Sequence, residues 1–215
     1  GKDDASPRGT MVSFTPDPQI FGSYAWNEEY IASRLRYYAH LNTGLTLVYN
    51  GQVFKSKEGL RDLVAQELGE AVPLYETLHG RAERLEFAFT HTHAYGENVL
   101  SFVNGQFTKD GGTHQSAFRE GVVKGVNEFA KESFAGEDVR DGLLAAVAVK
   151  IQDPVFESQT KNKLGSTDVR PWIVQEVRNA VLLWLHKHPE PAAKLLEKVR
   201  SNERLRKELA AIKKD

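Results

Sequence analysis

Residues 140–165 of the chain are RDGLLAAVAVKIQDPVFESQTKNKLG, and this stretch decides the fold. From Leu143 to Ile151 almost every side chain is apolar, so this segment offers no polar face to water. A continuous apolar run of this length, ended by Asp153-Pro154, predicts a strand at the centre of a sheet. Such a strand must be covered on both faces by other parts of the chain.

The sequence on either side supplies helices and strands for this purpose. Apolar residues at helical spacing predict helices, alternation predicts strands, and Asn50-Gly51 predicts a tight hairpin because both of its residues accept positive φ. We expect helices over residues 28–40, 57–68, 113–129, 168–186 and 191–213, and strands over residues 11–14, 45–49, 52–54, 84–93 and 98–103.

Together these elements predict an α+β fold, a mixed sheet with helices on one face. The strands over 84–93 and 98–103 are expected to pair across Tyr95-Gly96. The strand over 11–14 has no neighbour close in the sequence, so we expect it to be the end of an upstream element. The long C-terminal helix over 191–213 has a thin apolar stripe, which predicts that it projects beyond the core or packs on a partner.

Composition excludes several classes of protein. The 215 residues carry a formal net charge of -1 and no cysteine. Disulfides, thiolate metal sites and cysteine nucleophiles are therefore excluded, and the chain suits a reducing cytoplasm. A free-standing nucleic-acid-binding domain usually has a positive excess, which this chain lacks. No apolar run approaches the ~20 residues needed to cross a bilayer, so we expect no membrane association.

The polar loop after the central strand carries the most informative chemistry. Gln159 and Lys161 are two residues apart and would project to the same side of an extended backbone. An ammonium beside an amide donor suits a terminal phosphate. The alternative is a solvated surface loop in which the lysines only provide solubility. The residues alone leave both interpretations open.

Two other patterns have a functional and a structural interpretation. His91 and His93 stand at the end of a predicted strand, but two ligands do not make a metal site, so we expect structural or surface roles. Gly111-Gly112-Thr113 precedes a helix, where an anion could in principle bind; a tight turn with Thr113 as helix cap is the simpler expectation. Asp168 is expected to cap the helix over 168–186.

Several blocks resemble the B subunits of type IIA DNA topoisomerases, namely DNA gyrase and topoisomerase IV. The blocks are Gly9-Thr10-x-Val12-x-Phe14-x-Pro16-Asp17, Arg34-Leu35-Arg36 with Leu41-Asn42-x-Gly44, Asp110-Gly111-Gly112-Thr113-His114 with Phe118-Arg119, Arg140-Asp141-Gly142-Leu143, and Asp153-Pro154-x-Phe156-x-x-Gln159-Thr160-Lys161-x-Lys163-Leu164-Gly165. They occur in the order and spacing of that family from residue 9 to about residue 187. Their combination is highly specific.

The resemblance implies a transducer domain with the ribosomal protein S5 domain 2-like fold. It implies that residues 1–18 are the last strand of an N-terminal ATPase domain and that residues 19–187 are the transducer. Residues 188–215 would then be the helix that leads to a TOPRIM domain. No residue matches the family's catalytic glutamate, Mg²⁺-binding asparagine or acidic TOPRIM cluster. The resemblance therefore implies no catalytic residue and no metal ligand in this chain, although the full-length enzymes use Mg²⁺.

The resemblance also implies specific site residues. In the family, the lysine of the Q-T-K motif contacts the γ-phosphate of ATP, helped by the glutamine before it; here these are Lys161 and Gln159. Arg119 corresponds to an arginine that lines the DNA cavity, where it would make a sequence-independent phosphate contact. The alternative for Arg119 is an ordinary salt bridge on the helix surface.

The implied partners are the ATPase and TOPRIM domains, a second B subunit, the topoisomerase A subunit and double-stranded DNA. The implied function is coupling of ATP hydrolysis to gate movement and DNA strand passage, in a bacterial cytoplasm. Residues 113–120 favour topoisomerase IV over gyrase. Two alternatives are a stand-alone adaptor of the same fold, which binds nucleic acid or protein without nucleotide, and a MutL-like mismatch-repair ATPase.

Overall fold

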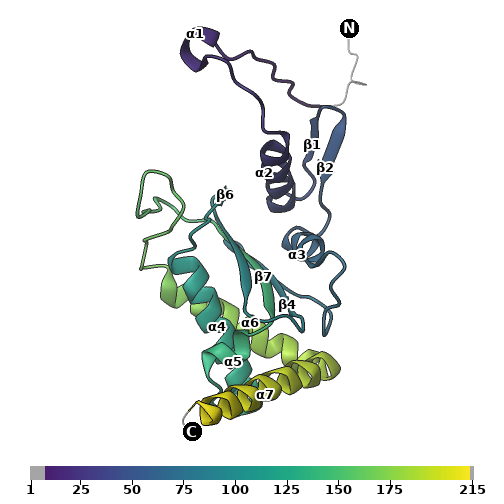
Figure 1. Ribbon diagram of the computed structural model, residues 1–215, viewed down its shortest axis with the longest axis vertical. Helices are drawn as coiled ribbons and strands as arrows, with labels where there is room; N and C mark the ends of the chain where they lie inside the picture. Colours follow the sequence, from purple (N-terminus) through teal and green to yellow (C-terminus); the bar gives the residue numbers. More distant parts are fainter. Residues whose placement is uncertain (1–7, 214–215) are drawn as a thin grey trace.

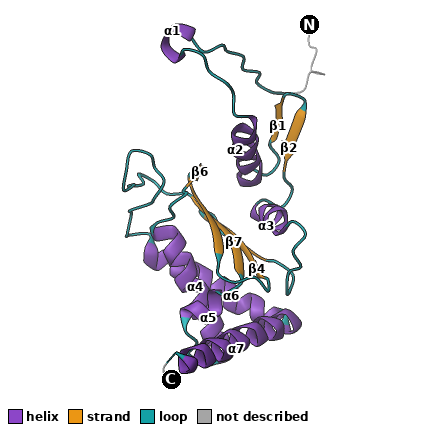
Figure 2. Ribbon diagram, in the orientation of Figure 1, coloured by secondary structure: helices purple, strands orange, loops and turns teal. Residues whose placement is uncertain are grey.

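A five-stranded mixed sheet forms the middle of the molecule in the computed structural model, which describes residues 8–213 (Figures 1 and 2). The predicted domain segments 1–18 and 188–215 therefore lie partly outside the described residues. The sheet has the strand order β3-β4-β7-β5-β6, in which only β5 and β7 run parallel. Its strands are β3 (Leu78–Arg81), β4 (Leu85–His91), β5 (Asn98–Val103), β6 (Gln106–Phe107) and β7 (Leu143–Val149).

The central strand is β7, as the apolar run predicts. It pairs antiparallel with β4 from Leu143 to Val149 and parallel with β5 from Leu144 onward. Six of its seven side chains are buried. Because helices cover both faces of the sheet at this position, neither face of β7 needs polar residues.

The predicted pairing of the strands over 84–93 and 98–103 is wrong. β7 lies between β4 and β5, and the connection through Tyr95 and Gly96 crosses the end of β7. There, Gly142 N–H donates to the Gly96 carbonyl at 2.6 Å, and Gly96 N–H donates to Asp141 Oδ1 at 2.6 Å. The physical reason is burial, because the most apolar strand is stabilised most at the centre of the sheet.

One face of the sheet is covered by α4 (Thr113–Ala130) and α6 (Arg170–Lys187). Phe118 of α4 packs between Phe87 and Phe89 of β4, and all three side chains are fully buried. The two helices approach closely because Gly121 and Gly125 of α4 face Val177 and Val181 of α6. A Cβ atom at either glycine would lie less than 3 Å from the facing valine.

The opposite face is covered by α3 (Leu60–Leu68) and by the end of α2 (Glu28–Leu41). Leu60, Leu63 and Val64 of α3 are buried against Phe102 and its neighbours in the sheet. Helices on one face were predicted, and α4 and α6 fit this. The cover on the second face was not predicted, because the position of α3 depends on contacts distant in the sequence.

The N-terminal part extends away from the sheet toward the top of Figure 1, and the end of α2 is where it contacts the sheet. It contains α1 (Pro18–Phe21), α2 and the hairpin of β1 (Thr46–Tyr49) and β2 (Gln52–Lys55), whose Asn50-Gly51 turn is confirmed. The strand predicted over 11–14 is wrong, since these residues form no strand and the side chains of Met11, Val12 and Phe14 are exposed. Within residues 8–213 no strand lies beside them to share backbone hydrogen bonds.

Several helix boundaries differ from prediction. The third helix starts at Leu60 instead of residue 57, because Asp62 Oδ2 accepts the N–H groups of Lys57 and Glu58 and holds them in a preceding turn. Asp168 does not cap α6, which starts at Arg170 without a side-chain cap. The last helix, α7 (Pro189–Ile212), starts two residues early. Prolines are tolerated in a first helical turn, where the N–H groups lack helical partners anyway.

Helix α7 crosses the end of the molecule that lies away from the β1–β2 hairpin (Figure 1). Its first half is buried through Ala192, Leu195 and Val199, whereas the apolar residues of its second half, Leu205, Leu209 and Ile212, are exposed, as the thin stripe predicts. A short helix, α5 (Gly136–Arg140), anchors it. Arg206 pairs with the buried Asp138 at 2.8 Å, and Asn202 donates to the carbonyl oxygens at the end of α5. No helix within residues 8–213 is long and apolar enough to span a bilayer.

His91 has a structural role. Its Nε2–H donates to the Val139 carbonyl at 2.7 Å, so Nδ1 accepts the hydroxyl of Tyr75. Burial lowers the pKa of His91 from 6.5 to about 4. The same cause lowers the pKa of His114 in α4 to about 4. Both imidazoles are therefore neutral in the folded protein at pH 7.

These two histidines predict a pH dependence of stability. Between pH 6.5 and about 4 the unfolded chain binds more protons than the folded chain at these two histidines. The free energy of unfolding therefore has its full value above pH 6.5 and falls as the pH drops. Each histidine contributes about 1.4 kcal/mol per pH unit in this range. Urea unfolding of the chain at several pH values measures the slope. The variants His91→Gln and His114→Gln should each reduce it by about one proton.

Thermal unfolding at pH 7 checks that each variant folds. An equal slope in all variants would mean that other groups cause the acid sensitivity.

Candidate functional site

The loop between β7 and α6 is held by backbone hydrogen bonds at its base and is exposed to solvent at its tip. Its two limbs form an antiparallel bridge at Phe156 and Leu164, with Glu157 N–H donating to the Lys163 carbonyl at 3.0 Å. Leu164 is buried in the main core. Residues 158–161 form the tip, and all four are exposed.

The second limb of this loop also pairs with the turn that precedes α4. Asp110 N–H donates to the Asn162 carbonyl (2.9 Å), Leu164 N–H to the Gly111 carbonyl (3.1 Å), and Thr113 N–H to the Leu164 carbonyl (3.0 Å). The Gly112–Leu164 contact is a parallel β-bridge. Two of the sequence blocks, distant in the chain, are thus one backbone-paired unit.

Gly112 is required for this pairing. A Cβ atom there would overlap the carbonyl oxygen and the nitrogen of Leu164, and Gly112 has φ +122°. Both the space and the backbone conformation exclude other residues. Thr113 is not the helix cap that was expected, because it is the first residue of α4 and its hydroxyl points to the Leu164 carbonyl at 3.4 Å. The turn before α4 therefore holds the loop after β7 through backbone N–H and carbonyl groups and not through a side chain.

The tip residues Gln159 and Lys161 do not lie in extended backbone. Lys161 N–H donates to the Ser158 carbonyl at 3.1 Å, which closes a turn, and Lys161 itself has φ +57°. The expectation that strand alternation puts Gln159 and Lys161 on one side therefore does not apply. Both side chains are exposed. Lys163 pairs with Glu157 at 3.1 Å, whereas Lys161 forms no ion pair within the described residues.

Arg119 lies on α4, and its guanidinium forms an ion pair with the carboxylate of Glu97. Its Nε donates to Glu97 Oε2 at 3.2 Å, and Nε of Arg140 lies 3.4 Å from the same oxygen. The surface salt bridge considered as the alternative for Arg119 is thus present. The second arginine, Arg140, was not expected, because it comes from the end of α5 and is distant in the sequence.

His114 is buried and not available to a ligand. Its Nε2 lies 2.9 Å from the hydroxyl of Thr108, which in turn donates to the Ser101 carbonyl at 2.8 Å. Together with His91, it belongs to the interior. Within residues 8–213 no group of three or more His, Asp or Glu side chains is placed to hold a metal ion.

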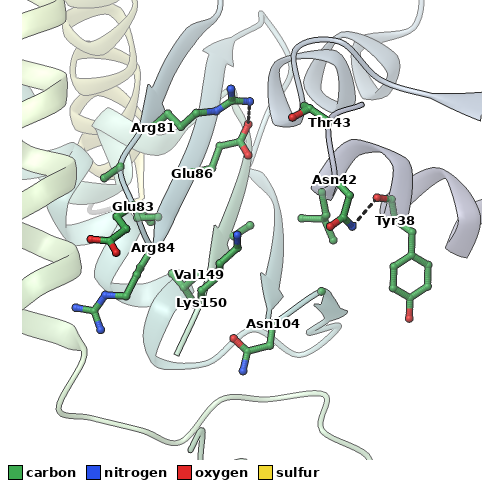
Figure 3. Close-up of a pocket in the computed structure, with 15 residues that line it drawn as sticks. Tyr38, Asn42, Thr43, Arg81, Glu83, Arg84, Glu86, Asn104, Val149 and Lys150 are labelled. Carbon is green, nitrogen blue, oxygen red and sulfur yellow. Dashed lines mark hydrogen bonds and ion pairs between the residues drawn. The ribbon is translucent and has the colours of Figure 1, made fainter. Parts of the chain in front are cut away.

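A groove of about 660 Å³ lies between the end of α2 and the ends of the strands (Figure 3). Its walls include Tyr38 and Asn42 on one side and Asn104 and Lys150 on the other. The Arg81–Glu86 ion pair at 3.1 Å closes one end of the groove. No lining residue belongs to the 158–161 tip, so this groove is separate from the loop.

The family model described as DNA gyrase B matches residues 48–214. The chain belongs to the DNA gyrase B family. The B subunit of DNA topoisomerase 4 from Borreliella burgdorferi is 47% identical over 207 residues, which cover 96% of this chain and 35% of that protein. The DNA gyrase B subunit of Archaeoglobus fulgidus is 33% identical over 219 residues, which cover 94% of this chain and 35% of that protein.

A solved structure agrees with this assignment. The 43K ATPase domain of Thermus thermophilus gyrase B, a complex with an aminocoumarin, superimposes with a TM-score of 0.80 at 29% identity, covering 94% of this chain and 60% of that one. The predicted resemblance and fold class are therefore confirmed. The chain spans about a third of the length of the two relatives above, at 35% of each.

Membership of the DNA gyrase B family leaves the individual site residues as predictions. The γ-phosphate contact of Gln159 and Lys161 and the DNA contact of Arg119 stay predictions. The family model begins at residue 48, whereas the transducer was predicted to begin at residue 19.

The Gly112–Leu164 pairing generates a test. Gly112→Ala should cost about 1–3 kcal/mol of unfolding free energy, because the methyl group clashes with Leu164 and the backbone is strained. It should also speed hydrogen exchange at the Leu164 and Thr113 amides. Gly69→Ala is the matched control, since Gly69 has φ +54° and open space around it. Unchanged exchange at both amides in Gly112→Ala would show that the bridge does not hold the loop.

Proposed function

We propose that the chain is the part of a type II DNA topoisomerase B subunit that couples ATP binding and hydrolysis to gate movement and DNA strand passage. Family membership and the names of the relatives support this proposal. The observation that carries the coupling role is the loop after β7, which has a fixed base and an exposed cationic tip.

Lys161 is proposed to contact the γ-phosphate of ATP held by a neighbouring ATPase domain, with Gln159 as a second donor. An exposed ammonium without an internal carboxylate partner can meet an anion without first breaking an ion pair. Such a contact exists only while the γ-phosphate is present, so it favours one orientation of the transducer in the ATP state. Mg²⁺ would be held by the ATPase domain, since this chain's described residues offer no cluster of ligands for it.

The N-terminal part is proposed to contact that ATPase domain. Exposed apolar side chains concentrate there, including Met11, Phe14, Phe21, Trp26 and Val53. Exposed apolar groups in such number indicate a covering partner. We keep the predicted boundaries, with residues 1–18 as the end of the ATPase domain and residues 19–187 as the transducer. Helix α7 then leads toward a TOPRIM domain.

Double-stranded DNA, a second B subunit and the topoisomerase A subunit are the proposed partners, in the cytoplasm. Arg119 is proposed to face the DNA. The identity of 47% with a topoisomerase 4 protein, against 33% with a gyrase protein, supports topoisomerase IV. A stand-alone adaptor and a MutL-like protein are not favoured by these relatives.

The coupling role is tested by the ATPase rate of this chain joined to its ATPase domain. Lys161→Ala should lower the steady-state rate about ten- to 150-fold, the equivalent of one charged hydrogen bond of about 1.5–3 kcal/mol. The circular dichroism spectrum should not change, because Lys161 is exposed.

Lys163→Ala is the control, because Lys163 carries the same charge two residues away and is paired with Glu157. It should retain most of the rate. Equal rates for Lys161→Ala and the unmodified protein would mean that the tip is an ordinary surface turn and that Lys161 does not contact the γ-phosphate.

A further inference from the structure

We propose that Arg119 and Arg140 together form a binding site for one phosphate group of duplex DNA, and that Glu97 fills this site when DNA is absent. The proposal deepens the proposed function, on which it rests for the presence of DNA. It adds a second arginine and an internal competitor to the predicted contact of Arg119.

The geometry brings two cations to one anion. Arg119 on α4 and Arg140 at the end of α5 both direct Nε to the same oxygen of Glu97, at 3.2 and 3.4 Å. The three side chains are about a quarter to a third exposed, so the cluster faces solvent without being fully hydrated. With two positive charges and one negative charge, the cluster keeps a net charge of +1.

Much of the donor capacity of this cluster is unused. Each guanidinium has five N–H donors, and the Nη groups of Arg119 and Arg140 donate to no acceptor within the described residues. The Nε of Arg140 is buried and also lacks a hydrogen bond of good geometry. By contrast, Arg178 and Arg200 each have a carboxylate of their own, Glu128 and Glu132. A phosphate suits the open cluster because its oxygens accept two parallel N–H groups from each arginine.

The segment Arg140-Asp141-Gly142 builds this site as a unit. Arg140 supplies a guanidinium. Asp141 accepts the N–H of Gly96 and Gly142 donates to the Gly96 carbonyl, both at 2.6 Å, so the turn that carries Glu97 is fixed beside Arg140. The Arg140-Asp141-Gly142 segment therefore positions both the second arginine and Glu97, in addition to leading into β7.

Glu97 has two consequences for DNA binding. It holds both guanidiniums in position before DNA arrives, and it must be displaced when a phosphate takes its place. Because it carries the same sign of charge as the phosphate, it lowers the affinity for DNA. Its removal should therefore strengthen binding, the opposite of what a purely structural ion pair predicts.

The test is binding of the 215-residue chain to a short fluorescein-labelled DNA duplex, followed by anisotropy from about 50 to about 200 mM salt. Arg140→Gln should weaken binding about fivefold, as for one partly exposed ionic contact. Because the two arginines would neutralise one phosphate together, Arg119→Gln/Arg140→Gln should reduce the slope of log affinity against log salt by about 0.9. Arg140→Lys should leave that slope nearly unchanged, because the charge is kept. Glu97→Gln should tighten binding about fivefold.

Two controls match these changes in charge. Arg178→Gln removes a positive charge and Glu132→Gln removes a negative one, each from a one-to-one ion pair elsewhere on the helices. Both should change the affinity far less than the site variants. Thermal unfolding of every variant checks the fold, and Arg140→Met, which keeps the packing of the aliphatic stem without the charge, replaces Arg140→Gln if that variant does not fold.

The outcomes separate this site from the proposed function. If Arg119→Gln weakens binding but Arg140→Gln behaves as Arg178→Gln does, the DNA contact stands and the two-arginine site is wrong. If Glu97→Gln binds no tighter than Glu132→Gln, Glu97 is not a competitor of phosphate. If the unmodified chain does not bind the duplex at about 50 mM salt, both the DNA contact and this site are contradicted.

Discussion

Three backbone hydrogen bonds join the turn before α4 to the loop after β7, and the proposed site depends on them. These hydrogen bonds involve no side chain, but position 112 must be a glycine. A Cβ atom there would clash with the backbone of Leu164. The pairing fixes the loop's base to the start of a core helix. It leaves the tip with Lys161 exposed, so a cation is presented on a rigid support. Under the proposed function, a contact with a neighbouring domain's ligand would move this support as a whole.

Close packing continues from this joint through the body of the domain. Gly121 and Gly125 let α4 lie against the valines of α6, and Phe118 connects α4 to the sheet. At the other end, the buried Asp138 holds Arg206 of α7. Continuous packing therefore extends from the loop to α7, an arrangement that suits a domain proposed to transmit a rotation. The N-terminal part is attached less extensively, through α2 and α3, and the groove near Asn104 separates it from the strand ends.

The sequence predicted the features that depend on local pattern and missed those that depend on distant contacts. The apolar run indicated the central position of β7, and Asn50-Gly51 indicated the hairpin. The insertion of β7 between β4 and β5 could not be predicted from Tyr95-Gly96, since a connection that crosses a strand end and a hairpin use the same residue types. The +57° φ of Lys161 is uncommon for a lysine, so an extended tip was the natural expectation. Arg140 has no local signal for a role beside Arg119, and only the fold brings both to Glu97.

The central claim is that Lys161 recognises the γ-phosphate from a rigid loop, and chemical labelling of its amine tests this most directly. The chain joined to its ATPase domain is treated with an amine-reactive reagent, with ADP or with a non-hydrolysable ATP analogue, and the modification of each lysine is measured by mass spectrometry. We predict that the analogue protects Lys161 and that ADP does not, while Lys163, paired with Glu157, labels equally in both states. Equal labelling of Lys161 with both bound nucleotides would contradict the account.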